Sequence, residues 1–147
     1  MMAASKDSVL DASNITRRLW IGGKPPFDRD LPEFDVLVLC AQEIQPRPKF
    51  HGLTIHCPLP DSALDHKELH IALLGGKRVA EELVAGKRVL VTCAMGINRS
   101  ALVTALGMSR VFKMNATQII ERIRERRNPL CLSNAHFVKY LHRFILR

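Results

Sequence analysis

The sequence predicts an α/β fold in which a central, mainly parallel sheet is flanked by helices. Short apolar runs typical of strands alternate along the chain with longer segments that carry an apolar residue every three or four positions, as helices do. The run at residues 35–40 is apolar almost throughout, which is typical of a strand buried on both faces. The 147 residues suffice for one domain with a substantial core.

We expect four strands, and two prolines define the end of the third. The strands cover residues 18–22, 35–40, 53–57 and 87–92. Neither Pro58 nor Pro60 can donate a hydrogen bond to a β-ladder, so the third strand is expected to stop at Cys57. Asp61 then falls on the loop just beyond that strand.

We expect four helical segments, over residues 65–85 and 99–113 and beginning near residues 115 and 133. Gly75 and Gly76 lie inside the first segment, and we expect them to break it into two pieces. Asn115 and Gln118 are spaced as a capping box for the third helix, and Ser133 is the predicted cap of the last.

The ends of the chain suggest a short tail followed by one domain. We expect residues 1–15 to be a flexible N-terminal tail and residues 16–147 to form the single domain. Residues 1–14 carry charge and no apolar block, unlike a secretory signal, and no apolar run approaches the roughly 20 residues of a membrane helix. We therefore expect a cytoplasmic monomer with no membrane contact, whose four cysteines are reduced.

The formal net charge of +8 favours anionic partners such as phosphoproteins, phosphoinositides or RNA, although a solvated basic surface is the simpler alternative. The densest basic group alternates with acidic residues, which is typical of a salt-bridged helix face. It comprises Glu121, Arg122, Arg124, Glu125, Arg126 and Arg127.

The most informative local pattern is Cys93 followed six residues later by Arg99, at the junction of an apolar strand and an apolar helix. A loop with Gly96 at its middle can turn several backbone N–H groups toward one anion, and the same donors favour a thiolate. Arg99 adds a planar fork that binds two phosphate oxygens. The pattern indicates phosphoryl transfer through a cysteinyl-phosphate, with a buried inert thiol as the alternative.

At these residues the chain resembles the dual-specificity branch of the cysteine-dependent protein tyrosine phosphatases. The signature of that family is His-Cys-x5-Arg-Ser/Thr, and here Thr92 stands in place of the His before Cys93, while Ser100 follows Arg99. The likeness extends over residues 16–146 and implies a phosphotyrosine-phosphatase-like fold. It also implies that the phosphate lies against the backbone of Ala94, Met95, Gly96, Ile97, Asn98 and Arg99.

The resemblance assigns roles to further residues. The family carries an aspartate about thirty residues before the nucleophile, and Asp61 lies 32 residues before Cys93. We expect Asp61 to protonate the leaving group and Ser100 to donate a hydrogen bond to the sulfur. Asp61 as an ordinary loop carboxylate is the alternative, and Asp65 is either the substitute acid or the cap of the next helix.

The predicted function is hydrolysis of phosphotyrosine, and also of phosphoserine or phosphothreonine, on a protein substrate without a cofactor. One alternative is an RNA 5′-triphosphatase, since the order Gly96-x-Asn98-Arg99 resembles that relative and the basic charge suits RNA. Another is a phosphate-binding module with little turnover, suggested by Thr92. We expect no metal site, because the helix with His66 and His70 lacks a glutamate directly after the first histidine.

Cys40 ends a strand that we expect to lie beside the Cys93 strand. Some phosphatases of the superfamily carry a second cysteine near the site that forms a disulfide with the nucleophile. Cys40 is therefore a candidate redox partner of Cys93. A buried apolar cysteine is the alternative.

Overall fold

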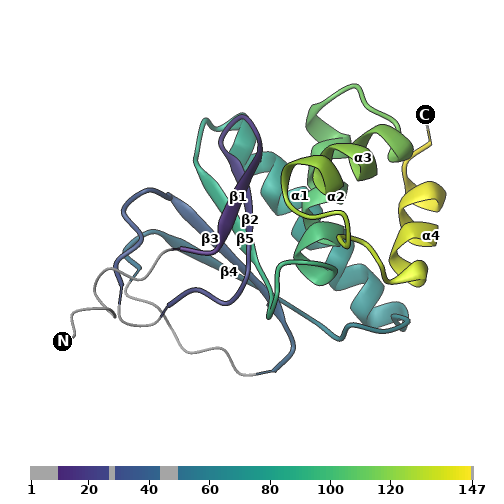
Figure 1. The fold of residues 1–147 in the computed structure, drawn as a ribbon, viewed down its shortest axis with the longest axis horizontal. Coiled ribbons are helices and arrows are strands. Elements are labelled where there is room, and N and C mark those ends of the chain that lie inside the picture. Colours follow the sequence, from purple (N-terminus) through teal and green to yellow (C-terminus); the bar gives the residue numbers. More distant parts are fainter. Residues whose placement is uncertain (1–9, 27–28, 44–49, 147) are drawn as a thin grey trace.

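The computed structural model describes residues 10–26, 29–43 and 50–146. One five-stranded sheet forms its centre, with the spatial order β1 (Ala12–Thr16), β2 (Leu19–Gly22), β5 (Val89–Thr92), β3 (Val36–Ala41) and β4 (Leu53–Leu59) (Figure 1). Strand β1 pairs antiparallel with β2, and all the other pairs are parallel. The expected mainly parallel sheet is therefore confirmed.

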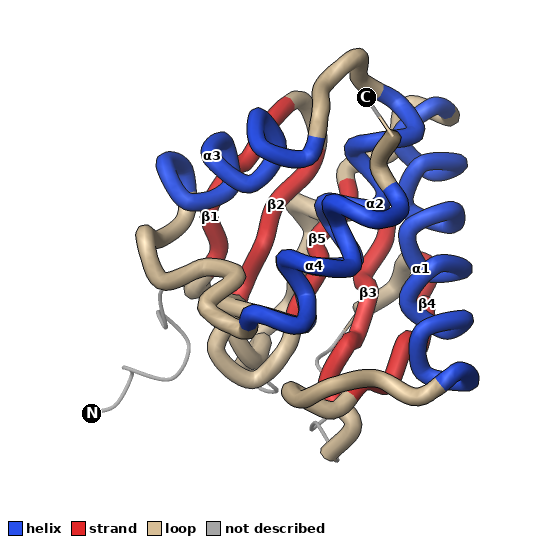
Figure 2. Tube along the Cα trace, turned by 90° about the vertical axis from the view of Figure 1, so that its right-hand side faces the viewer, coloured by secondary structure: helices blue, strands red, loops and turns tan. Residues whose placement is uncertain are grey.

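The helices lie together on one face of the sheet, as Figure 2 shows. They are α1 (His66–Val84), α2 (Arg99–Val111), α3 (Ala116–Arg126) and α4 (Ala135–Phe144). Between these helices and the sheet lies the larger apolar cluster, while a smaller cluster that includes Leu31, Phe34 and Leu37 covers the other face. In the described residues, no helix has both the length and the apolar character needed to cross a membrane.

Strand β3 is buried along its whole length, as its apolar sequence predicts. Val36, Val38 and Cys40 belong to the cluster beneath the helices, whereas Leu37 and Leu39 belong to the cluster on the other face. This alternation follows from the two-residue repeat of a strand. It places the Cys40 side chain on the same face as α1 and α2.

Helix α1 is continuous, so the expected break at Gly75 and Gly76 is wrong. Both glycines are buried, and each lies where another side chain or helix approaches closely. A Cβ on Gly75 would lie 2.5 Å from Cys57 Sγ, and a Cβ on Gly76 would lie 2.6 Å from Leu106 Cβ in α2. The glycines therefore permit close packing, and this outweighs their low helix propensity.

Strand β4 continues through Pro58 to Leu59, so the expected end at Cys57 is also wrong. The strand lies at the edge of the sheet, where a proline needs no partner for its missing N–H. The register of β4 against β3 shifts between Leu39 and Ala41, close to this proline. Asp61 still lies on the loop that follows the strand.

The N-terminal boundary differs from the expected one. Residues 12–15, assigned to the tail, are part of β1, because pairing with β2 satisfies their backbone and Ile15 is fully buried. Residues 1–9 of the expected tail lie outside the described residues.

Three helix N-termini show how local sequence positions the helices. Asn115 and Gln118 form the predicted capping box of α3, and Asp65 forms one with Glu68 at the start of α1. The last helix is capped by Asn134, whose side chain accepts a hydrogen bond from the His136 N–H, and not by Ser133 as expected. The cap of α4 therefore lies one residue later than predicted.

We predict that Gly76→Ala lowers the free energy of unfolding by roughly 1–2 kcal/mol. The new methyl would meet Leu106 Cβ at 2.6 Å and the Leu106 carbonyl carbon at 3.1 Å, which only a movement of one helix can relieve. Urea unfolding measures the change, and the exposed neighbour Lys77→Ala is the control. Equal midpoints for the two variants would contradict close packing of α1 on α2.

Candidate active site

Cys93 directly follows β5, and Arg99 begins α2, so the signature loop of residues 94–98 joins the centre of the sheet to a buried helix. The parallel strands β5, β3 and β4 all end at this edge of the sheet. The segments that follow β3 and β4 carry Glu43 and Asp61 to the same edge. The site is thus assembled from the carboxyl ends of three neighbouring strands.

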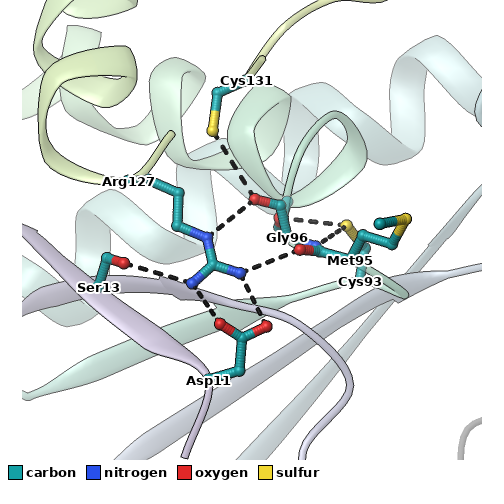
Figure 3. Close-up of polar contacts among 8 residues, drawn as sticks. Asp11, Ser13, Cys93, Met95, Gly96, Arg127 and Cys131 are labelled. Carbon is teal, nitrogen blue, oxygen red and sulfur yellow. Dashed lines mark hydrogen bonds and ion pairs between the residues drawn. The ribbon is translucent and has the colours of Figure 1, made fainter. Parts of the chain in front are cut away.

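Four consecutive carbonyl groups of the signature loop are bound by donors outside the loop. Arg127 supplies two of these donors, and Figure 3 shows its guanidinium beside Met95 and Gly96. The donor–acceptor pairs are Lys24 N to Ala94 O (3.2 Å), Arg127 Nη2 to Met95 O (3.0 Å), Arg127 Nε to Gly96 O (3.3 Å) and Leu132 N to Ile97 O (2.9 Å).

These bonds determine where the amide groups of the loop point. In a planar trans peptide the N–H points opposite to the carbonyl of the preceding residue, and all the described peptides are trans. The N–H groups of residues 95–98 therefore face away from the bound carbonyls, toward the inside of the loop. The Gly96 N–H donates to Cys93 Sγ at 3.3 Å, as this geometry requires.

Gly96 is the one residue of the signature loop that must be glycine. Its φ of 69° lies in the left-handed region. A Cβ there would lie 2.6 Å from the carbonyl carbon and oxygen of Gly22, and 2.6 Å from Arg127 Nη2. Gly22 in turn accepts a hydrogen bond from the Cys93 N–H at 3.3 Å, so the end of β2 lies directly against the loop.

Cys93 as a residue is 2% exposed, and its sulfur lies 3.2 Å from the Ser100 hydroxyl oxygen. Burial alone would raise the pKa of Cys93, but hydrogen bonds from the Ser100 side chain and backbone and from the Gly96 and Ile97 amides outweigh burial. The pKa of Cys93 is therefore lower than that of an ordinary thiol. The loop stabilises the thiolate, which is the reactive form.

Arg99 is buried and is oriented by two partners. Its Nη1 and Nη2 donate to the Glu43 carboxylate at 2.5 and 3.0 Å, and Nη1 also donates to the Leu59 carbonyl at 3.2 Å. The Arg99 hydrogen bonds lower the pKa of Glu43 to about 2, so the pair stays ionised at neutral pH. Glu43 was not predicted from the sequence, although a carboxylate just after a strand that ends at this edge was a usable signal.

Asp61 lies next to the signature loop, as its spacing from Cys93 predicts. Asn98 Nδ2 donates to one oxygen of its carboxylate at 3.1 Å, and Asn134 Nδ2 donates to the other at 2.8 Å. Asp65 is instead the cap of α1, and its carboxylate accepts from the Glu68 N–H at 2.8 Å. The structure therefore brings Asp61, and not Asp65, into the network of the loop.

Asn98 has a second role in the scaffold, because its Oδ1 accepts a hydrogen bond from the Asn134 backbone N–H at 3.0 Å. It thus links the signature loop to the Asp61 loop and to the start of α4.

Thr92, which stands in place of the family His, is fully buried and donates from its hydroxyl to the Val38 carbonyl at 3.3 Å. That hydroxyl ties β5 to β3.

Three thiols lie in one row across neighbouring strands. Leu39 of β3 pairs with Thr92 of β5 on one side and with His56 of β4 on the other. Each of these three paired residues is followed directly by a cysteine, namely Cys40, Cys93 and Cys57. All three cysteines are buried in the cluster beneath the helices. Burial, together with the nearby Cys57 thiol, raises the pKa of Cys40 well above that of an ordinary thiol.

A cavity of about 340 Å³ opens beside Asp61 and is lined by Asn98, Asn134 and His136 among others. A larger cavity of about 620 Å³ lies at the opposite end of the sheet, near Asp35 and Arg88, far from Cys93. The smaller cavity thus adjoins Asp61 and the end of the signature loop at Asn98. Within the described ranges, no group of three or more metal-ligating side chains is present.

Comparison with known proteins identifies the family and the fold. The family model described as dual specificity phosphatase, catalytic domain, matches residues 30–145. A search of curated proteins gives no match. Among solved structures, a variant of human DUSP28 is 19% identical with a TM-score of 0.79, and the match covers 93% of this chain and 95% of that one.

Two further structures share the fold. A mouse putative dual specificity phosphatase is 18% identical with a TM-score of 0.76, over 97% of this chain and 93% of that one. The human tyrosine phosphatase-like serine/threonine/tyrosine-interacting protein is 19% identical with a TM-score of 0.73, over 92% and 96%. Since the family model spans most of the sequence, the chain belongs to the dual specificity phosphatase family and is a cysteine-dependent protein phosphatase of that family.

Proposed function

We propose that the protein hydrolyses phosphotyrosine, and also phosphoserine and phosphothreonine, on protein substrates through a cysteinyl-phosphate intermediate. The observation that carries the proposal is the position of the Cys93 sulfur beneath inward-facing amides, followed by Arg99 as the first residue of the next helix. A phosphoryl group placed there would have its oxygens among N–H donors and its phosphorus above the thiolate.

The first step is an in-line displacement. The Cys93 thiolate attacks phosphorus, a sulfur–phosphorus bond forms, and the bond from phosphorus to the leaving oxygen breaks. The loop amides and Arg99 bind the equatorial oxygens, where charge spreads in the transition state. Asp61 gives its proton to the leaving oxygen, for which the cavity beside it provides space.

The second step regenerates the thiolate. Asp61, now a carboxylate, takes a proton from water, and the resulting hydroxide attacks phosphorus. The sulfur–phosphorus bond breaks, and the Ser100 hydroxyl, 3.2 Å from the sulfur, donates a hydrogen bond to the departing thiolate. Inorganic phosphate leaves and the enzyme returns to its starting state.

The contacts of Asn98 favour phosphomonoesters over 5′-triphosphorylated RNA as substrates. The resemblance of the signature loop to the RNA enzymes rests on the order Gly-x-Asn-Arg. Here the Asn98 side chain is hydrogen-bonded to Asp61 and to the Asn134 backbone. An aspartate held beside the loop can protonate a poor leaving group such as a tyrosine or serine oxygen. Phosphoinositides are disfavoured because the signature loop contains no lysine.

We predict that Asp61→Asn slows release of phosphate from a phosphotyrosine peptide by about 10²–10⁴-fold, because the leaving oxygen then departs without a proton. The loss should be much smaller with a nitrophenyl phosphate, whose leaving group is already stable as an anion. Cys93→Ser sets the background rate, and Asp65→Asn, which removes the charge of a helix-capping residue and keeps its acceptor oxygen, is the matched control.

Three results would contradict the proposal. The first is a larger loss of turnover in Asp65→Asn than in Asp61→Asn. The second is faster turnover of triphosphorylated RNA than of any phosphopeptide. The third is tight phosphopeptide binding without release of phosphate, the behaviour of a binding module.

We predict that Ser100→Ala raises the pKa of Cys93 and slows breakdown of the phosphoenzyme by about tenfold, since both depend on a hydrogen bond to the sulfur. The rate of iodoacetamide alkylation against pH measures the first effect, and burst kinetics measure the second. Ser109→Ala, on the same helix but bonded to the Leu106 carbonyl, is the control. An unchanged alkylation profile in Ser100→Ala would contradict this role.

We further propose that Cys40 protects Cys93 from irreversible oxidation. A peroxide converts the Cys93 thiolate to a sulfenic acid, and the Cys40 thiol then attacks that sulfur, releasing water and forming a disulfide. The row of thiols supports this, and because burial raises the pKa of Cys40, this cysteine is mainly the neutral thiol until Cys93 is oxidised. Mass spectrometry of peroxide-treated protein should find the peptides of Cys40 and Cys93 linked, and Cys40→Ser should accumulate sulfinic acid at Cys93. A link only between Cys40 and Cys57 would contradict the proposal.

A further inference from the structure

Arg127 uses its whole guanidinium to connect the signature loop to β1. It follows the last residue of α3, and its side chain is 8% exposed. On one side, Nε and Nη2 donate to the carbonyls of Gly96 and Met95 (Figure 3). On the other side, Nη1 and Nη2 donate to the two oxygens of Asp11 at 2.7 and 3.0 Å, and Nη1 also donates to the Ser13 hydroxyl at 3.3 Å. These five bonds account for all five N–H groups of the side chain.

The two peptides that Arg127 holds are those whose amides face the sulfur. The peptide that carries the Met95 carbonyl ends in the Gly96 N–H, and the peptide that carries the Gly96 carbonyl ends in the Ile97 N–H. These are the two loop amides, between Cys93 and Arg99, that stabilise the thiolate. One guanidinium outside the loop thus determines the direction of two donors inside it.

Glycine at this position makes an external restraint necessary. With no Cβ, Gly96 can adopt either sign of φ, so the peptides on its two sides can rotate at low steric cost. If they rotated, carbonyl oxygens would face the thiolate and the bound phosphate in place of N–H groups. The partners of the Met95 and Gly96 carbonyls therefore decide which orientation is stable.

We propose that Arg127 is a positioning residue for phosphoryl transfer, which keeps the Gly96 and Ile97 amides turned toward the phosphate, and that Asp11 holds Arg127 in the orientation this requires. The inference rests on the proposed cysteinyl-phosphate mechanism. Asp11 is mostly exposed, with 63% of its side chain accessible, so its removal leaves no cavity in the core. Its contribution can therefore be separated from the packing of the fold.

The variants are chosen to separate positioning from charge and from packing. Arg127→Lys keeps the charge but lacks the planar fork that binds two carbonyls and a carboxylate together. Asp11→Asn keeps the shape of the side chain and removes its charge. Arg126→Met removes one positive charge from the neighbouring, exposed position and is the control.

Three measurements are made on each variant: the pH dependence of Cys93 alkylation, the affinity for tungstate by calorimetry, and kcat and KM on a phosphotyrosine peptide. We expect Arg127→Lys to shift alkylation to higher pH, weaken tungstate binding and lower kcat/KM, the latter two by roughly 10–100-fold. Asp11→Asn should show the same changes to a smaller degree. In the Arg127→Lys background it should add little, because the two residues act together.

Unchanged alkylation profiles and tungstate affinities in both single variants, whatever their melting temperatures, would overturn the inference. The ion pair of Arg127 with Asp11 would then only stabilise the fold. If Arg127→Lys does not fold, the exposed Asp11→Asn decides the matter alone. Failure of the proposed function gives a different pattern. In that case the wild-type protein releases no phosphate. Asp11→Asn still shifts the alkylation profile and weakens tungstate binding relative to the wild type.

Discussion

The site depends on the direction of four carbonyl groups. Lys24, which follows β2, and Arg127 and Leu132, which both lie between α3 and α4, bind the carbonyls of residues 94–97 from outside the signature loop. Because a peptide is planar, binding each carbonyl on the outside fixes the following N–H on the inside. In the proposed mechanism these N–H groups are in place before the substrate binds, so little reorganisation is needed in the transition state.

The charged groups around the loop are arranged at the edge where β5, β3 and β4 end. Arg99 is paired with Glu43, which follows β3, and Asp61 on the loop after β4 is bound by the amides of Asn98 and Asn134. Each group is thus oriented by a residue from a different segment. The sheet brings the segments together, while the hydrogen bonds between them hold the Arg99 guanidinium and the Asp61 carboxylate beside the signature loop.

The sequence was informative where the chemistry is local. Cys93, Gly96 and Arg99 lie within seven residues, so their spacing and the strand and helix beside them predicted the loop. The partners Glu43 and Arg127 were not predicted, because 56 and 31 residues separate them from the atoms they bind. The glycine pair in α1 was misread for a related reason, since its benefit comes from Cys57 and Leu106, which the local pattern does not include.

We infer that the loop amides of the free protein already face the position of the phosphate. A crystal structure of the protein with tungstate tests this most directly, since the ion resembles phosphate in shape and charge. We expect tungstate directly above Cys93 Sγ, within hydrogen-bond distance of the N–H groups of residues 95–98 and of Arg99. Tungstate bound elsewhere, or any carbonyl of residues 94–97 turned toward it, would contradict the account.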